Sequence, residues 1–231
     1  MPDAPPAVTI AALELSAPRE DRQGLAGFYG STLGLASAGD DAFAVGAARL
    51  SLRVGEPSRR PFHHLALLVP GDRFEAARAW ASERTSLLDG PGGTPHVRFD
   101  AWDADAVYFH DPAGSIVELI AHRGIAEAGT TGPFDPAELT GISEAGLVLE
   151  DAAAAARALR EQLAFELWSG DPADGLAFVG RRAHTLILAA PGRGWLPTGR
   201  RAERHPVAVV VEGTGRSGSV ELPGGCVVRA A

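Results

Sequence analysis

The feature that most constrains the fold of this chain is a pattern that occurs three times: a strand, an amphipathic helix, then several short strands. The copies cover residues 8–54, 62–121 and 142–189 and recur at roughly fifty to sixty residues, a period typical of repeat architectures. One unit alone leaves a sheet face bare, so we expect units to pair. The predicted fold class is α+β, with repeated βαβββ units paired into curved mixed sheets that form a ligand cleft.

Local patterns define the elements of the first two units. An apolar helical stripe from Leu25 to Leu33 ends at Gly34, and a second stripe, from Phe74 to Ala81, follows Asp72, a good helix N-cap. Strands are predicted around these helices at 8–17, 42–45, 48–54, 62–69, 86–88, 96–99, 106–110 and 115–121.

The third unit has the clearest helix, at 152–163, which begins after the capping residue Asp151. Its strands are predicted at 142–149, 176–179 and 183–189.

The tail of the chain departs from the repeat. Strands are predicted at 206–212 and 219–229, and the glycine-rich segment between them leaves no room for a helix. We interpret the tail as a fourth unit reduced to strands. Residues 123–138, rich in Gly, Thr and Pro, form the expected linker between a domain at 1–122, made of units one and two, and the remainder at 139–231.

Composition excludes several classes of function. The 231 residues carry a net charge of −8 and scattered basic residues, so no nucleic-acid partner is expected. The single cysteine, Cys226, excludes an intrachain disulfide and a cysteine-based zinc cluster, and is expected to be buried. The N-terminus does not resemble a signal peptide and no apolar run reaches transmembrane length, so we expect a cytoplasmic protein without a membrane partner.

One carboxylate stands out in the stretch 107–122. Asp111–Gly114 predicts a tight turn, because Pro112 presets φ and Gly114 tolerates positive φ. The aliphatic strand after it is interrupted by Glu118, which is costly to desolvate unless it is exposed, paired or metal-bound. Its structural alternative is a pair with an arginine such as Arg49 or Arg53, and its functional roles are metal ligand or general base.

These motifs in this order resemble the vicinal oxygen chelate superfamily, which includes glyoxalases, bleomycin-resistance proteins and extradiol dioxygenases. The likeness covers residues 8–121 most strongly and matches a bacterial glyoxalase-like or ring-cleaving-dioxygenase-like subgroup. It rests on Phe28-Tyr29, Leu33-Gly34-Leu35, His64-Leu65-Ala66-Leu67, Tyr108–Gly114, Val117–Ile120, Ser143–Leu147 and Gly194–Thr198.

The resemblance implies a divalent metal, Fe, Mn, Ni or Zn, held by the first and last strands of paired units, with His64 and Glu118 as ligands. Unit one departs from this pattern, because Ala12 and Ser51 fall at its ligand positions. In unit three, Glu144 falls opposite His64, and the last-strand position falls near Thr185.

Two ligands are fewer than catalytic metals usually have. The predicted candidates for a third are His63, His96, His110, Glu14 and Glu144.

Each of these residues also has a purely structural interpretation. His64 could be hydrogen-bonded at the rim of the sheet, and Glu144 could be a solvated charge at a strand end. His63 should be exposed because it points away from His64, and His110 and His122 are expected at the surface.

The aromatic residues near the site have two interpretations as well. Trp102 and Tyr108 could line an aromatic pocket or lie in the core, and Trp195 is expected to pack.

Three functions are consistent with the sequence. The first is a metal-dependent enzyme, dioxygenase- or lyase-like, acting on a small oxygenated or aromatic substrate. The second is a non-catalytic binder of a small molecule such as an antibiotic, with or without metal, which the missing ligands of unit one favour. The third is a scaffold without a ligand. Whether units pair within the chain or across a homodimer is left open, and fold alone does not settle the chemistry.

Overall fold

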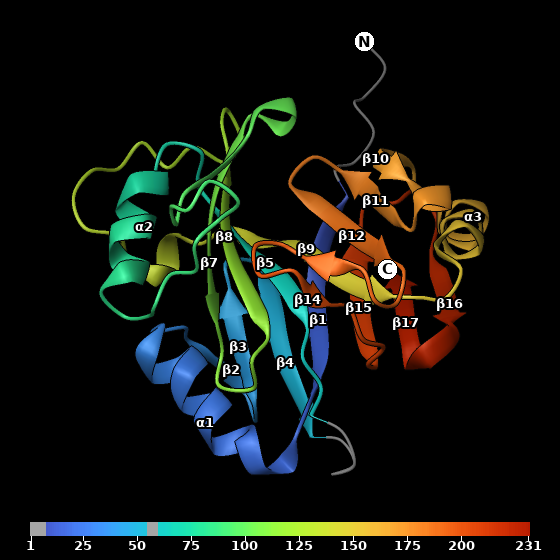
Figure 1. Cartoon of the computed structure of the whole chain (residues 1–231), viewed down its shortest axis with the longest axis horizontal. Coiled ribbons are helices and arrows are strands. Elements are labelled where there is room, and N and C mark those ends of the chain that lie inside the picture. The colour runs from blue at the N-terminus through green and yellow to red at the C-terminus, as the bar shows by residue number, and fades with distance from the viewer. Residues whose placement is uncertain (1–7, 55–59) are drawn as a thin grey trace.

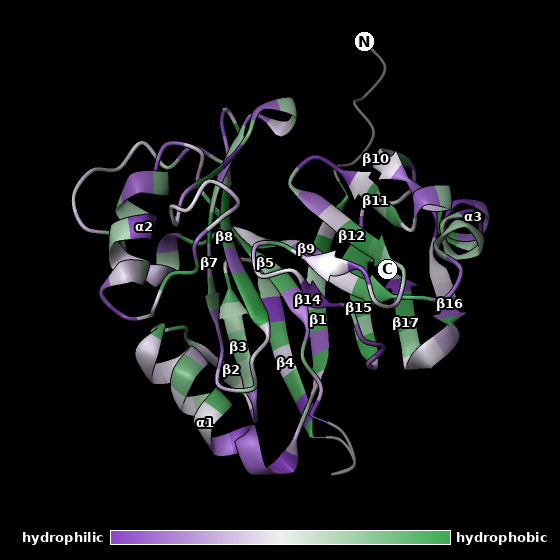
Figure 2. Cartoon of the chain, in the orientation of Figure 1, coloured by the Kyte–Doolittle hydropathy of each residue, from purple (hydrophilic) through white to green (hydrophobic). Residues whose placement is uncertain are grey.

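The computed structural model describes residues 8–54 and 60–231, which form an α+β fold of strands with helices on their outer sides (Figure 1). Helices α1 and α2 lie at one side of the molecule and α3 lies at the other. The central strands are largely hydrophobic, and the polar residues concentrate in loops and on the outer helix faces (Figure 2).

The elements follow the predicted repeat. Unit one contains β1 (Thr9–Ala17), α1 (Arg22–Gly27), β2 (Ser37–Gly39), β3 (Ala42–Val45) and β4 (Ala48–Val54). Unit two contains β5 (His64–Val69), α2 (Phe74–Ser82), β6 (Val97–Phe99), β7 (Ala104–His110) and β8 (Ile116–His122). Unit three contains β9 (Gly141–Val148), α3 (Ala152–Leu163), β10 (Leu167–Asp171), β11 (Leu176–Arg181) and β12 (His184–Ala189).

The remaining strands lie in the tail. A short hairpin is formed by β13 (Gly194–Trp195) and β14 (Arg200–Arg201), and the strand-only fourth unit contains β15 (Val207–Glu212), β16 (Gly218–Leu222) and β17 (Cys226–Ala230).

Strand pairing groups the units in an order that the sequence left open. β5 pairs antiparallel with β9, which joins units two and three in the order β6-β7-β8-β5-β9-β12-β11-β10. β1 pairs antiparallel with β15, which joins units one and four in the order β2-β3-β4-β1-β15-β17-β16. A single pair, Ile10 with Ile142, links the two series. The pairing therefore takes place within one chain.

The expected division into domains at 1–122 and 139–231 stays a prediction, but hydrogen-bonded strand pairs cross it. The connecting residues are also well anchored. Arg73 donates to a carboxylate oxygen of Glu138 at 2.7 Å and to the carbonyl oxygens of Thr130, Gly132 and Pro133. This buried guanidinium fixes the segment between units two and three against the start of α2.

Several local predictions are confirmed, and others are wrong. Asp151 caps α3 by accepting from the Ala154 N–H, but Asp72 does not cap α2, because its carboxylate accepts from the N–H groups of Ala128 and Gly129. Residues 86–88 form no strand and contribute one bridge, from Leu88 to Tyr108. The predicted strand at 219–229 is a hairpin, β16 and β17, that turns at 223–225.

The core lies on both faces of β5. Leu65, Leu67 and Val69 pack into the main core with the helices, whereas Ala66 faces a smaller hydrophobic cluster on the opposite side of the sheet. Cys226 is buried, as predicted. None of the helices in the described part of the chain is long and apolar enough to cross a membrane.

Gly46, in the turn between β3 and β4, brings unit one against the start of β9. Its φ is +56°, and a Cβ there would lie 2.3 Å from the backbone carbon of Thr140. Gly124 also has positive φ, +72°, but no atom lies within 4 Å of its Cβ position.

We therefore expect Gly46→Ala to destabilise the protein by about 1–3 kcal/mol more than Gly124→Ala, because both strain the backbone but only the first overpacks it. Urea unfolding of the two variants measures the difference. Equal destabilisation would contradict the close packing at Thr140.

Candidate metal centre

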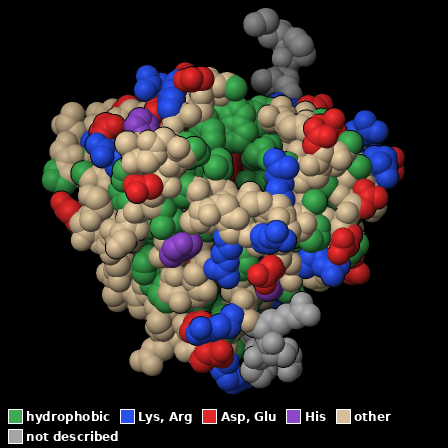
Figure 3. All heavy atoms as spheres, in the orientation of Figure 1, with side chains coloured by type: hydrophobic (Ala, Val, Ile, Leu, Met, Phe, Trp, Pro, Cys, Tyr) green, Lys and Arg blue, Asp and Glu red, His purple; other side chains and the backbone are tan. Residues whose placement is uncertain are grey.

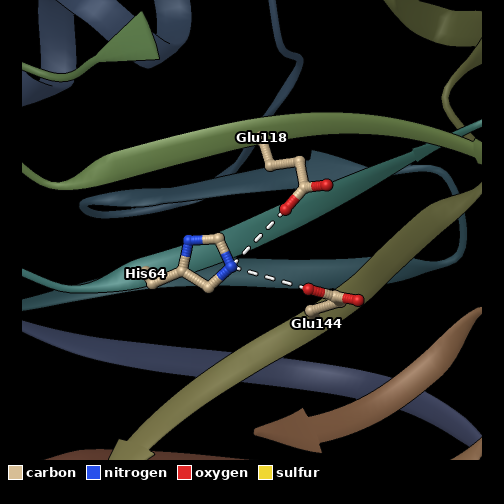
Figure 4. Close-up of side chains that lie close together, drawn as sticks. All are labelled: His64, Glu118 and Glu144. Carbon is tan, nitrogen blue, oxygen red and sulfur yellow. Dashed lines mark ion pairs between the residues drawn. The ribbon is translucent and has the colours of Figure 1, made fainter. Parts of the chain in front are cut away.

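Three side chains converge on the face of the unit-two and unit-three sheet that lies opposite the main core. Ala66, in the central strand β5, pairs with Glu118 of β8 on one side and with Glu144 of β9 on the other. His64, two residues before Ala66, points to the same face. Ala66 has a small side chain, and the carboxylates of Glu118 and Glu144 both point towards the imidazole of His64 (Figure 4). We call His64, Glu118 and Glu144 the triad.

The triad is compact and almost completely buried. His64 Nε2 lies 3.5 Å from Glu118 Oε2 and 3.5 Å from Glu144 Oε2, and one ligand atom from each residue fits within 4.8 Å of the others. The exposed fractions are 5%, 2% and 4%. Glu144 is therefore not the solvated strand-end charge that its sequence allowed, and it is the third candidate ligand.

Two buried carboxylates side by side raise the cost of ionisation. Burial raises the pKa of Glu118 well above its ordinary value, the neighbouring Glu144 carboxylate raises it further, and a hydrogen bond from Tyr108 partly opposes both. The Tyr108 hydroxyl donates to Glu118 Oε1 at 3.0 Å. This bond fixes the carboxylate so that Oε2 is the oxygen that faces His64.

The arginine partner considered for Glu118 is ruled out. Arg53 pairs instead with Glu14 at the surface, at 3.1 Å. Within the described residues, the hydrogen-bond and ion-pair partners of Glu118 are Tyr108 and His64. Neither carries a permanent positive charge, so no fixed cation offsets the charge of Glu118 when it ionises, and a metal ion could do so.

The donor set fits a divalent metal ion. One imidazole nitrogen and two carboxylate oxygens suit Fe, Mn, Ni or Zn. Ligand atoms bound to one such ion in tetrahedral or octahedral geometry lie about 3–3.5 Å apart, and the two distances from His64 Nε2 are in this range. The triad could therefore hold a metal ion.

The strand register shows why the site has three candidate ligands and not four. In unit two, Glu118 pairs with the residue two positions after His64. In unit three the equivalent residue is Ile187. It pairs with Gly146, which is two positions after Glu144. The sequence placed this position near Thr185, which is wrong by two residues, because Thr185 pairs with Glu144 itself.

The sheet formed by units one and four has no comparable donor set. Its four equivalent positions, found by the same strand register, are occupied by Ala12, Ser51, Ala208 and Arg229. By this register Ser51 pairs with Glu14, two positions after Ala12, as Glu118 pairs with Ala66 two positions after His64. In the described part of the chain, one group of at least three potential ligands is present, the triad.

The triad lies in the wall of a cavity of about 280 Å³. A hollow surrounded by hydrophobic side chains is visible on this face, with acidic atoms in its depth (Figure 3). Trp102 and Tyr108 both line the cavity, as proposed from the sequence. The other lining residues are Phe99, Leu176, Phe178, Ile187, Ala189, Arg193, Gly194, Trp195 and Leu196.

Trp195 does more than pack. Its ring stacks on the imidazole of His64, with centroids 5.0 Å apart and an interplanar angle of 27°. The hairpin of β13 and β14 thereby lies against the histidine of the triad. No local pattern indicates this contact, because Trp195 is 131 residues from His64 and lies in a hairpin after β12.

The other candidate ligands lie elsewhere. His96 pairs with Asp105 at 2.8 Å, and His110 is exposed and outside the cavity lining. His63 is buried, contrary to expectation, and its Nε2 donates to the Ser16 carbonyl oxygen at 2.9 Å. His122 was expected at the surface and is 1% exposed.

The raised pKa of Glu118 predicts how the metal-free protein responds to pH. The folded state keeps the Glu118 proton to higher pH than the unfolded chain, whose glutamates titrate near about pH 4.3. The stability that protonated Glu118 contributes is therefore fully present below the pKa of the unfolded chain. It is lost as the pH rises through the pKa of Glu118 in the folded protein.

We expect Glu118→Gln, which cannot ionise, to be more stable than the wild type by about 1–4 kcal/mol at pH 7.5 in chelator, and the gap to shrink towards pH 4.5. Thermal and urea unfolding across this pH range measure the gap. The matched control is Glu14→Gln at the exposed pair with Arg53, which should change stability by less than about 0.5 kcal/mol. A pH-independent loss of stability in Glu118→Gln would contradict the assignment.

Neither a protein-family model nor a curated protein matches this sequence. Solved structures do match. A "putative dioxygenase" from Bacillus subtilis aligns with a TM-score of 0.59 and 14% identity over 99% of this chain and 86% of its own. A glyoxalase I variant from Zea mays aligns with a TM-score of 0.52 and 15% identity over 97% of this chain and 94% of its own. Identities this low show the fold alone. The resemblance expected from the sequence is confirmed at that level, and the chain has the fold of the vicinal oxygen chelate superfamily.

Proposed function

We propose that this protein is a divalent-metal-dependent enzyme of the dioxygenase or lyase type, acting on a small oxygenated or aromatic compound. The observation that carries the proposal is the triad, a buried set of three converging donors in the wall of an apolar cavity. A metal bound there would bind two neighbouring substrate oxygens and stabilise the negative charge that develops on them.

The residues of the chain have distinct tasks in this proposal. His64, Glu118 and Glu144 would hold the ion, and the pair of carboxylates would balance its two positive charges. Tyr108 keeps the Glu118 carboxylate in one orientation through its hydrogen bond to Oε1, as groups behind metal ligands commonly do. The ring of Trp195 stacks on the imidazole of His64 and keeps its plane in one orientation.

The open side of the site follows from Ile187. Because this residue occupies the position of a fourth ligand and cannot bind a metal, at least one coordination position is left for water or substrate. Ile187 lines the cavity, so the open position faces the space where a substrate would lie. The aromatic and aliphatic walls exclude bulk water, which strengthens the interactions of charges in the site.

The runner-up function is binding of a small molecule without turnover, as in bleomycin-resistance proteins. The aromatic lining favours it, since Phe99, Trp102 and Phe178 would hold a planar ligand whether or not a metal is present. The two functions differ in whether ligand binding depends on the triad.

Metal content tests the proposal directly. Protein purified without chelators, with Fe, Mn, Ni and Zn supplied in turn, should contain about one equivalent of metal per chain by elemental analysis. His64→Ala and Glu144→Gln should each lower the affinity by at least about tenfold. Glu14→Gln, which alters a surface carboxylate, is the control and should keep its metal. If the wild-type protein stays metal-free under every supplement, the metal-dependent enzyme is excluded, and binding of a small molecule without turnover is the remaining function.

The register of the fourth position gives a second test. Ile187→Glu adds a carboxylate where unit two has Glu118, so the metal-free variant should be less stable than the wild type. Added metal should then raise its melting temperature by more than it raises that of the wild type. Thr185→Glu is the matched variant, two residues away on the same strand, and should show no such extra gain. Equal gains in both variants would show that the register equivalence is wrong.

A further inference from the structure

We propose that the cavity selects a single-ring aromatic compound that carries a carboxylate, and that Arg193 binds this carboxylate at the cavity rim. The inference rests on the proposed metal-dependent function and names its substrate class. It follows from the position of Arg193, from its lack of an acidic partner and from the apolar space between it and the triad.

Arg193 lies where the chain leaves β12 and begins the hairpin over the triad. It lines the cavity, and its Nη1 donates to the Asp174 carbonyl oxygen at 3.4 Å. Leu176, two residues after Asp174, also lines the cavity, so this contact places the guanidinium at the rim. Basic side chains are visible beside the hollow in Figure 3.

Arg193 has unused capacity to bind an anion. In the described part of the chain it forms no ion pair, and one of its five N–H groups makes a hydrogen bond. Two other arginines of this segment have further partners, since Arg200 also lies over the ring of Phe62 and Arg204 pairs with Glu150. A guanidinium with free parallel donors suits a carboxylate, which it binds in bidentate geometry.

Charge makes Arg193 distinctive within the cavity. The charged residues among those that line it are the triad's two carboxylates and this one arginine. A divalent ion in the triad would balance Glu118 and Glu144, so the deep end would be close to neutral. The rim would then be the positive end of the cavity, and an anionic group would be bound there without repulsion from the triad.

The space between the two ends is suited to one aromatic ring. Trp102 is stacked on Phe99 with centroids 5.3 Å apart and meets Phe178 edge to face at 4.7 Å. The three rings are half-buried and together form much of the aromatic lining of the cavity that also contains Arg193 and the triad. The cavity volume of about 280 Å³ is at the small end for ligand sites, which favours a single ring over a larger compound.

A matched pair of probes tests the inference. 3,4-Dihydroxybenzoate and 3,4-dihydroxybenzamide both offer two neighbouring oxygens and differ in charge. Calorimetric titration of the zinc-loaded full chain should show the acid binding about tenfold or more tighter than the amide. Arg193→Met should bring the ratio near one through weaker binding of the acid, with the amide within about twofold of its wild-type affinity.

The matched control is Arg201→Met, an exposed arginine opposite Gly194 in the same hairpin and outside the cavity lining, which should keep the wild-type ratio. Arg193→Lys should keep part of the preference. The inference is overturned if the wild type prefers the amide, if Arg193→Met keeps the acid preference, or if neither probe binds the zinc-loaded protein.

Zinc content measured on the same samples separates this inference from the proposed function. Zinc-loaded protein without an acid preference would contradict the inference alone. Protein that takes up no zinc would contradict the proposed function. In that case benzoate and benzamide, titrated into the metal-free wild type and Arg193→Met, still decide whether Arg193 recognises a carboxylate.

Discussion

The site depends on the repulsion between two buried carboxylates, Glu118 and Glu144, which lie on either side of Ala66. Ionisation of both without a cation is costly, because each is removed from water and each opposes the charge of the other. The hydrogen bond from Tyr108 relieves part of this cost for Glu118, and the imidazole of His64 lies against both. A bound cation would stabilise the fully ionised form, so in the proposed function metal binding and folding stability are parts of one equilibrium.

The register of β5 is the structural basis of this arrangement. The strand is parallel to β8 and antiparallel to β9, so Ala66 can have a glutamate as its neighbour on both sides. Leu65 and Leu67 anchor the strand in the main core. A slip of one residue would turn every side chain of a strand to the other face, and the leucines would then face the cavity. The hydrophobic core therefore specifies the geometry of the polar site.

The sequence was sufficient for elements whose signal is local. The bounds of α3, β3 and β4 were predicted as the structure has them, because helix propensity, capping and alternation act within a few residues. Glu118 could be singled out for the same reason, as one carboxylate in an apolar strand. Asp72 was misassigned because its carboxylate can cap a helix or bind a loop, and distant backbone N–H groups at Ala128 and Gly129 decided between the two.

Contacts between units were beyond local reasoning. Glu144 was one of five candidates for a third ligand in the sequence, and the pairing of unit two with unit three is what singles it out. No pattern within either strand specifies that pairing. The burial of His63 and His122 has the same origin, since His63 is hydrogen-bonded to Ser16 of unit one and His122 lies near Arg182 and His184 of unit three. Trp195 acquires its contact with His64 from a loop whose path depends on the completed sheet.

The triad has donors on three sides and an aliphatic residue on the fourth, which faces the cavity. Three of the four equivalent strand positions carry donors, and the fourth carries Ile187. An aliphatic side chain at that position prevents a closed four-ligand shell, which is the arrangement of structural metal sites. Because Ile187 and the aromatic wall lie on the cavity side, the incomplete part of the shell is also the part that a ligand can reach. In the proposed function, Ile187 would weaken the hold on the ion and would also leave the ion open to a substrate, and this is why we favour chemistry over a purely structural metal.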